Sequence, residues 1–248
     1  MMGLKPGTDN YSQSVHMFSI KTDSLNSFIK LQNNKGQVEF KSNDIITFPG
    51  SSENDTIKAS IVFAGYGFQN NETEYNDYEE IDLKDKVVMI MTRNLELALD
   101  INQTNDNTNI EMAKLARIFM SGAKAVILIP DPVNPDISWY EMVKDYASQG
   151  IYQLDTSQTQ KMPGSILLAN NKTANAILKE SGKTLEDIQR EINNTRKPNS
   201  FELKNVTAEI QLAKKVEPVS GENIIAVIEG SDTVLKNECV VLSAHYDH

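Results

Sequence analysis

The chain has 248 residues, of which 40% are hydrophobic and 23% charged, a balance typical of globular proteins that allows one large domain or two ordinary ones. Its formal net charge of -10 argues against nucleic-acid binding, because that role needs a basic surface to meet the phosphates. No apolar run approaches the ~20 residues that span a bilayer, and residues 1–10 lack the basic start and apolar core of a signal peptide. We therefore expect neither a nucleic-acid partner nor a membrane span.

The first quarter of the chain predicts short strands. Residues 24–31 fit either a short helix or an extended segment. Gly65 and Gly67 end the last of the apolar runs in this part, which is a turn signature. Four segments are rich in β-forming residues: 15–20, 37–40, 45–48 and 58–68.

The middle of the chain predicts a strand, a helix and a second strand. Residues 87–91 and 125–129 are continuous apolar runs, typical of buried strands. Between them, residues 110–120 carry apolar side chains at helical spacing, with Gly122 as the helix C-cap. Residues 94–109 are polar and rich in asparagine, which predicts a loop or lid.

Two features near these strands look at first like ligand sites. The acidic segment of residues 72–85 lacks the regular spacing of an EF-hand loop, so it predicts a solvated turn rather than a calcium site. The Gly-Tyr-Gly sequence at residues 65–67 is followed by no helix start, so it does not fit a phosphate-binding loop.

The last third of the chain predicts two helices followed by strands. The first helix covers residues 172–181 and ends at Gly182, and Thr184 is the N-cap of the second, with Asp187 in its first turn. A turn is predicted at residues 217–221. The predicted strands of this part are residues 163–168, 206–212 and 223–228.

The final nine residues predict a buried strand that runs into metal-binding residue types. Cys239, the only cysteine, precedes this run and fits a small buried core position. Because side chains alternate along a strand, His245 and Asp247 would point the same way. A metal-bound histidine usually donates its other N–H to a carboxylate or carbonyl, so this pair suits a ligand and its neighbouring acid. A His-x-Asp triplet alone equally describes a solvated strand end.

Both ends of the chain resemble one family, the co-catalytic zinc aminopeptidases, which includes aminopeptidase Y and glutamate carboxypeptidase. Residues 222–232 and 240–248 are similar to the entry to its catalytic domain, a strand of the type N-v-i-A-x-i-x-G, a polar turn and a second strand that ends in A-H-x-D. Residues 2–7 and 11–13 resemble the G-L-x-P…Y-x-Q segment that follows the first helix of such peptidases.

The central part resembles a protease-associated domain, which this family often carries as an insertion. The matching order is strand, acidic turn, strand, helix, Gly-Ala and strand, over residues 63–127. The resemblance implies a mixed α/β and β-rich fold, with the β-rich domain inserted into the start of an α/β zinc-exopeptidase domain. Its three parts are the start of the peptidase domain (1–50), the protease-associated domain (51–198) and the first catalytic strands (199–248).

The resemblance also implies a chemistry. In the family, the histidine at the position of His245 binds one of two zinc ions, and the carboxylate at the position of Asp247 neighbours that ligand. His248 would be a supporting or structural residue. We expect the amino-terminal portion of a Zn²⁺-dependent aminopeptidase that acts on peptide substrates, with the other zinc ligands downstream and with no activity in this chain alone. The family is often exported, so we expect an extracytoplasmic location.

Other functions remain open at this level. The principal alternative is a non-catalytic protein- or peptide-binding module built on the protease-associated domain. A carbohydrate- or matrix-binding β-domain would need an aromatic stripe on a strand, and only 7% of the residues are aromatic. The chain has no G-x-S-x-G elbow, which argues against a serine hydrolase. The patch of Trp139, Tyr140, Met142 and Val143 suits packing, with substrate gating as the alternative.

Overall fold

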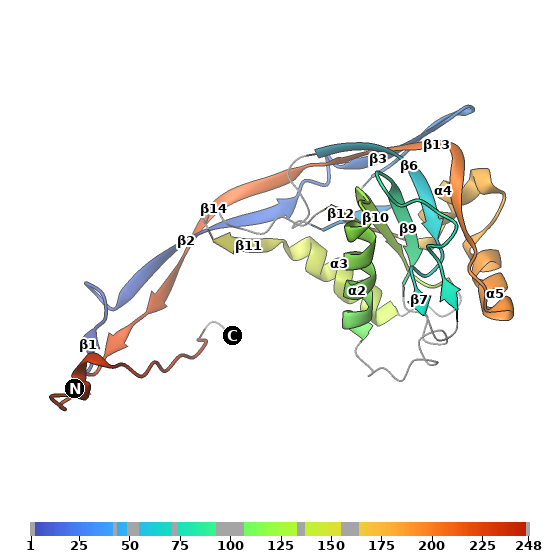
Figure 1. Cartoon of the computed structure of the whole chain (residues 1–248). Coiled ribbons are helices and arrows are strands. Elements are labelled where there is room, and N and C mark those ends of the chain that lie inside the picture. Colours follow the sequence, from blue (N-terminus) through green and yellow to red (C-terminus); the bar gives the residue numbers. More distant parts are fainter. Residues whose placement is uncertain are drawn as a thin grey trace.

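The structure, a computed structural model, describes residues 3–41, 44–48, 55–70, 74–92, 107–132, 137–154 and 164–246. Figure 1 shows a body of one large sheet with helices, and a long arm of paired strands that leads away from it. The described start of the chain lies at the far end of this arm (Figure 1).

The body is built on an eight-stranded sheet with the order β4-β3-β13-β6-β9-β10-β12-β5. Its four central neighbours, β6, β9, β10 and β12, run parallel, and the strands on either side are antiparallel to their partners. The strands are β3 (Phe28–Asn33), β4 (Gly36–Phe40), β5 (Ile45–Thr47), β6 (Asp55–Ala64), β9 (Val87–Met91), β10 (Ala125–Ile129), β12 (Ser165–Ala169) and β13 (Ser200–Leu212).

Helices cover both faces of this sheet, because its parallel strands are apolar on both faces. In β10, for example, Ile127 and Ile129 belong to one core and Val126 and Leu128 to the other, as the alternation of a strand requires. Helices α4 (Asn171–Leu178) and α5 (Leu185–Thr195) contribute to the first core, and α2 (Asn107–Met120) and α3 (Ile137–Gln149) to the second. The fold is therefore a mixed α/β one with a strand-rich sheet, as predicted.

The predicted helix ends are confirmed. Gly122, with φ of 87°, donates its N–H to the carbonyl of Phe119 at the end of α2. Gly182 has φ of 73° after the short 3-10 helix η1 (Lys179–Ser181) that extends α4. Thr184 caps α5, since its hydroxyl accepts the N–H of Asp187 at 3.2 Å.

The arm is an antiparallel pair of long strands, β2 (Ser12–Thr22) and β14 (Lys214–Ile224), in register from Thr22–Lys214 to Ser12–Ile224. Near the body, β11 (Ile151–Leu154) adds a third strand against β2. At the far end, β1 (Lys5–Pro6) pairs with β15 (Ala226–Val227). The remaining elements are β7 (Gln69–Asn70), β8 (Tyr75–Asn76) and the 3-10 helix η2 (Leu235–Asn237).

One local prediction was wrong. The turn predicted at residues 217–221 lies inside β14, where Glu217, Pro218 and Gly221 each pair with a residue of β2. Pairing with a distant strand keeps this Pro- and Gly-containing segment extended, and β14 is an edge strand, where proline is tolerated. The patch at residues 139–143 belongs to the helix α3, which the sequence did not predict. Most of the predicted loop at residues 94–109 lies outside the described residues, and its last three residues begin α2.

The buried strand predicted at the end of the chain is also wrong. Val240, Val241 and Leu242 are 91%, 79% and 94% exposed and belong to no strand. Cys239, predicted to be buried, is exposed as well. A strand needs a neighbour for its N–H and C=O groups, and no described strand pairs with residues 238–246. The apolar pattern predicts a segment suited to burial, but it cannot supply the partner that buries it.

The eight-stranded sheet takes strands from all three predicted parts of the chain, because β3, β4 and β5 lie before residue 51 and β13 after residue 198. The assignment of the three parts to family domains stays a prediction. Within the described ranges, no helix has the length and apolar character needed to cross a bilayer.

Candidate functional site

His245, the predicted zinc ligand, lies in an extended segment of residues 238–246 that has no regular structure, and its side chain is exposed. Asp247 and His248 lie outside the described residues. The predicted pairing of His245 with the Asp247 carboxylate therefore stays a prediction. His16, also exposed, is on β2 opposite Ser220.

A zinc site needs three or four protein ligands, usually histidine, cysteine or carboxylate groups. Within the ranges that the structure describes, no three such groups come close enough together to hold a metal ion. The described residues around His245 thus do not fit a complete zinc site, and no catalytic step can be derived through a metal held by them.

An open space separates the segment of residues 237–246 from the far end of the arm. It has a volume of about 1510 Å³ and is lined by residues 221–230 and 237–246, which include His245. The segment is tied back to the arm where the Tyr246 hydroxyl donates to the Glu222 carbonyl at 3.1 Å. This volume exceeds the roughly 300–1,000 Å³ of ordinary small-molecule pockets, so the space is not a closed ligand site.

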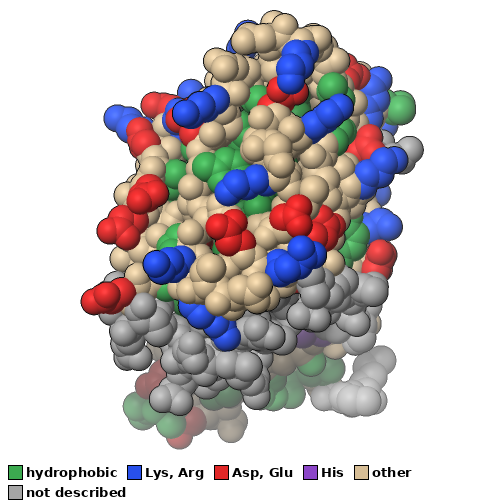
Figure 2. Space-filling model, turned by 90° about the vertical axis from the view of Figure 1, so that its right-hand side faces the viewer, with side chains coloured by type: hydrophobic (Ala, Val, Ile, Leu, Met, Phe, Trp, Pro, Cys, Tyr) green, Lys and Arg blue, Asp and Glu red, His purple; other side chains and the backbone are tan. Residues whose placement is uncertain are grey.

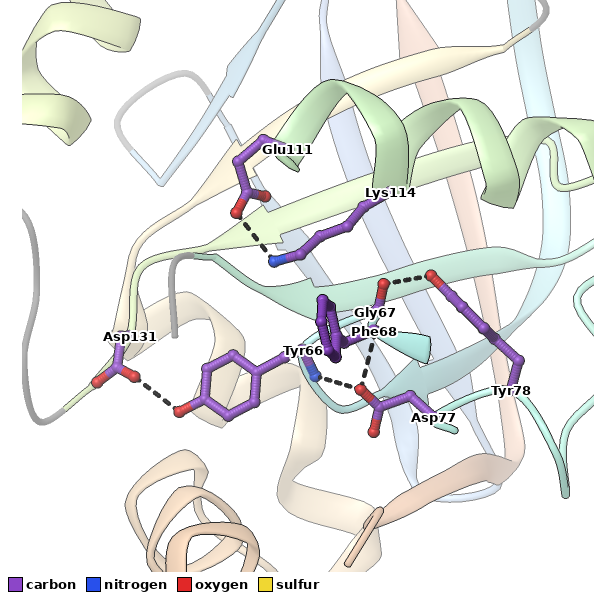
Figure 3. Close-up of polar contacts among 8 residues, drawn as sticks. All are labelled: Tyr66, Gly67, Phe68, Asp77, Tyr78, Glu111, Lys114 and Asp131. Atoms are coloured by element: carbon purple, nitrogen blue, oxygen red, sulfur yellow. Dashed lines mark hydrogen bonds and ion pairs between the residues drawn. The ribbon is translucent and has the colours of Figure 1, made fainter. Parts of the chain in front are cut away.

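A second group of polar residues lies inside the body, at the carboxyl ends of β6 and β10 (Figure 3). Its centre is Asp77, whose side chain is 1% exposed. One carboxylate oxygen accepts the backbone N–H groups of Tyr66 and Phe68, at 3.1 and 3.0 Å. The other accepts the hydroxyl of Tyr75 at 2.8 Å. These three donors therefore converge on one buried carboxylate, and the Ser200 hydroxyl is a fourth, longer donor at 3.5 Å.

These bonds fix the turn that follows β6. Gly65 and Gly67 have φ of 50° and 66°, a conformation that glycine adopts far more readily than other residues. A Cβ on Gly65 would collide with the carboxylate of Asp77. Tyr78 closes the turn from the other side, because its hydroxyl donates to the Gly67 carbonyl at 2.5 Å. The turn and the carboxylate thus fit together only while residue 65 has no side chain.

The cluster reaches across the sheet through a second buried acid. The Tyr66 hydroxyl donates to Asp131 at 2.7 Å, and the Gln189 amide of α5 lies 3.5 Å from the other oxygen of that carboxylate. Asp131 is 4% exposed and Gln189 is 2% exposed. The turn after β6, the end of β10 and helix α5 are therefore joined by side-chain hydrogen bonds.

One ion pair lies close to this cluster, on helix α2 (Figure 3). Lys114 and Glu111 are 2.9 Å apart, and each side chain is 6% exposed. Burial raises the pKa of the Asp77 carboxyl, and the positive charge of Lys114 is one of the effects that oppose this rise. A buried pair of this kind is strongly destabilising to break, because the remaining charge would be left without compensation.

Burial dominates the acidity of Asp77. Removal from water raises the pKa of this carboxyl to about 6, against the hydrogen bonds from Phe68, Tyr75 and Tyr66, which lower it. Burial, and then the negative charge of Asp77, raise the pKa of the Tyr75 hydroxyl well above its ordinary range. The same two causes raise the pKa of Tyr78.

The prediction that residues 72–85 form a solvated turn fits the exposed acids Glu79, Glu80, Asp82 and Asp85 but is wrong for Asp77, which is 1% exposed. The carboxylate is held in the core, because the N–H groups that satisfy it come from the preceding glycine turn. The available signal was the pair of tyrosines, Tyr75 and Tyr78, around one acid in an otherwise polar run. Because Asp77 is buried and its carboxylate is hydrogen-bonded to the turn at residues 65–68, we infer that the cluster organises this turn.

No protein-family model matches this chain, and a search of curated proteins finds no match. The resemblance to zinc aminopeptidases therefore stays a prediction, which depends on the motifs at the two ends and in the central part of the sequence.

We predict that Gly65→Ala destabilises the protein by at least about 3 kcal/mol, because the new methyl group adds a clash with buried Asp77 to the cost of a left-handed conformation. Gly182→Ala is the matched control, since Gly182 has φ of 73° with nothing within 4 Å of its Cβ position. The control should lose only about 1–2 kcal/mol. Urea unfolding measures both, and equal losses would show that the close approach to Asp77 is unimportant.

We predict that Asp77→Asn changes how stability depends on pH. The folded pKa of about 6 lies above the ordinary value of 3.8, so the folded state binds the proton more tightly. This contribution to stability is complete below pH 3.8 and is lost as the pH rises through 6. It amounts to about 3 kcal/mol.

The asparagine cannot titrate but can still accept the two N–H groups. The free energy of unfolding of the wild type, minus that of the variant, should therefore fall over this pH range in urea titrations. A constant difference would contradict a raised pKa at Asp77.

Proposed function

We propose that this chain is the amino-terminal portion of a zinc-dependent aminopeptidase, and that its body is a protease-associated domain inserted into the start of the peptidase domain. The observation that carries this proposal is the pairing of β1 with β15 at the far end of the arm. The two segments that resemble the peptidase family lie together there, and the whole body lies between them in the sequence.

Several contacts hold these two segments together. Gly7 donates its N–H to the Ile225 carbonyl at 3.0 Å, and Ile225 donates to the Tyr11 carbonyl at 2.7 Å. The Asn223 side-chain amide donates to Gln13 at 3.2 Å, although 210 residues separate them. An inserted domain leaves and re-enters its host through two neighbouring connections, and the arm supplies such a pair.

On this proposal the insertion is the body, which is wider than the predicted residues 51–198 because its sheet runs from Phe28 to Leu212. The arm strands β2 and β14 are then the outgoing and returning connections. His245 follows the returning strand, as a ligand on one of the first catalytic strands would.

Zinc, when bound, would lower the pKa of a bound water and polarise the scissile carbonyl of a peptide. The role proposed for His245 is to supply one imidazole nitrogen to the metal, and that of Asp247 is to hold the imidazole in place. The remaining ligands would come from outside the described residues.

We predict that the full-length gene product cleaves an aminoacyl-p-nitroanilide in a zinc-dependent way and that His245→Ala lowers kcat/KM by on the order of 100-fold or more, since even the loss of a ligand's supporting group costs 10–100-fold. The variant should also bind less zinc, as measured by elemental analysis of the purified protein. Val38→Ala is the control, because this residue is 53% exposed on β4 of the body. A full-length protein that binds no zinc and cleaves no aminoacyl substrate would favour the non-catalytic binding module instead.

We predict that the 248-residue chain alone has no aminopeptidase activity. The reason is that a catalytic zinc needs three protein ligands, and the described residues around His245 supply fewer than three. The assay is the same, with added zinc. Zinc-dependent turnover by the purified chain, removed by a chelator, would show that this number of ligands is wrong.

A further inference from the structure

The arm is a thin sheet with apolar side chains on both faces. We call β2, β11 and β14 together the arm sheet. On one face, Met17 lies between Leu154 and Val219 in the strand register. On the other face, three residues away along each strand, the register gives the row Ile151, Ile20 and Val216.

Much of this apolar surface is open to solvent. Tyr152 is 71% exposed, Val216 is 55% exposed and Leu154 is 54% exposed. A sheet that is apolar on both faces is normally covered on both, and contiguous exposed apolar surface marks a contact with another structure. By contrast, Figure 2 shows the face of the body seen from the side away from the arm, where acidic and basic side chains are interspersed.

Two observations argue against a second copy of the chain as the partner. Pairing along the outer edge of β14 is hindered by Pro218, which lacks an N–H in the middle of that strand. Packing two copies face to face would also bring together two chains that each carry a net charge of -10.

The course of the chain points to a different partner. Beyond β15, the segment of residues 228–246 turns back beside the arm, and Tyr246 is bonded there to Glu222 of β14 (Figure 1). Between this segment and the arm lies the open space of about 1510 Å³, which is large enough for a structural element rather than a small ligand. Val240, Val241 and Leu242 are themselves 79–94% exposed on this segment.

We propose that the arm sheet is the docking surface for the domain that continues from Tyr246 in the same polypeptide. That domain fills the space between residues 221–230 and 237–246 and covers the apolar rows of the arm sheet. The inference rests on the proposed function, which identifies the domain as the peptidase. The docked arm then fixes the orientation of the body relative to His245.

The test is hydroxyl-radical footprinting of the full-length protein beside the 248-residue chain. Labelling of Tyr152 should fall at least about fivefold in the full-length protein, because a buried side chain keeps less than a tenth of its surface. Tyr146, which is 58% exposed on α3 of the body, is the internal control and should be labelled equally in both.

A variant pair extends the test. Leu154→Glu in the full-length protein should restore labelling of Tyr152 toward the level of the isolated chain, because Leu154 lies on the same face of β11 as Tyr152. Val38→Glu should leave it unchanged, since Val38 is 53% exposed on β4, against 54% for Leu154. Circular dichroism of both variants in the isolated chain, where each position is exposed, checks that the fold is intact.

The outcomes separate this inference from the proposed function. Protection of Tyr152 without peptidase activity would support docking and refute the peptidase. Full activity with equal labelling of Tyr152 in both proteins would overturn docking and leave the peptidase standing. Protection of Tyr152 in the isolated chain that grows with its concentration would identify a second copy as the partner and overturn the inference.

Discussion

The body depends on one constraint, which is that β6, β9, β10 and β12 are apolar on both faces. A strand of this kind is stable only between two covering layers, so the chain must cross to alternate faces with α2 and α3 on one and α4 and α5 on the other. The parallel direction of these strands then brings their carboxyl ends to one edge of the sheet. The turn after β6 and the acid after β10 meet there, which explains why the buried polar residues Asp77, Thr92 and Asp131 lie at this edge.

Asp77 shows how that edge is organised, because two opposing effects act on the same carboxylate. Its three donors favour the charged form, while burial opposes it, and the raised pKa shows that burial is the larger effect. The ionised carboxylate is therefore retained at an energetic cost. In this position the carboxylate holds the shape of the turn at residues 65–67, in which the glycines are left-handed. It accepts N–H groups that would otherwise lack a partner in the core. A reactive role would need an open path to the acid, and the 1% exposure of Asp77 argues against one.

What could be predicted from the sequence was local. The strands at Val87–Met91 and Ala125–Ile129 and the caps at Gly122 and Thr184 follow from patterns within a few residues. The wrong predictions concern residues whose structure depends on contacts with distant segments of the chain. Pro218 and Gly221 predict a turn by local chemistry, whereas their pairing with β2, some 200 residues earlier, makes a strand. Burial of Asp77 depends on donors from another turn, and the strand predicted at residues 240–242 lacks a described neighbour. The site at His245 and Asp247 remains a prediction for the same reason, since a metal site is assembled from distant segments.

The arm is the part of the structure that local sequence patterns predict least well. It is also the part on which the proposed function depends most. Two strands alone make a marginal sheet in water, and β11 supports only the part of β2 next to the body. A body attached through such a ribbon would change its orientation freely, since few contacts would cross between it and its host. Covering the exposed row at Val216 removes that freedom and buries apolar surface at about 25 cal/mol per Å². An insertion can therefore act on a site near His245 only if its arm is docked, and the apolar faces of the arm sheet are the feature that makes docking favourable.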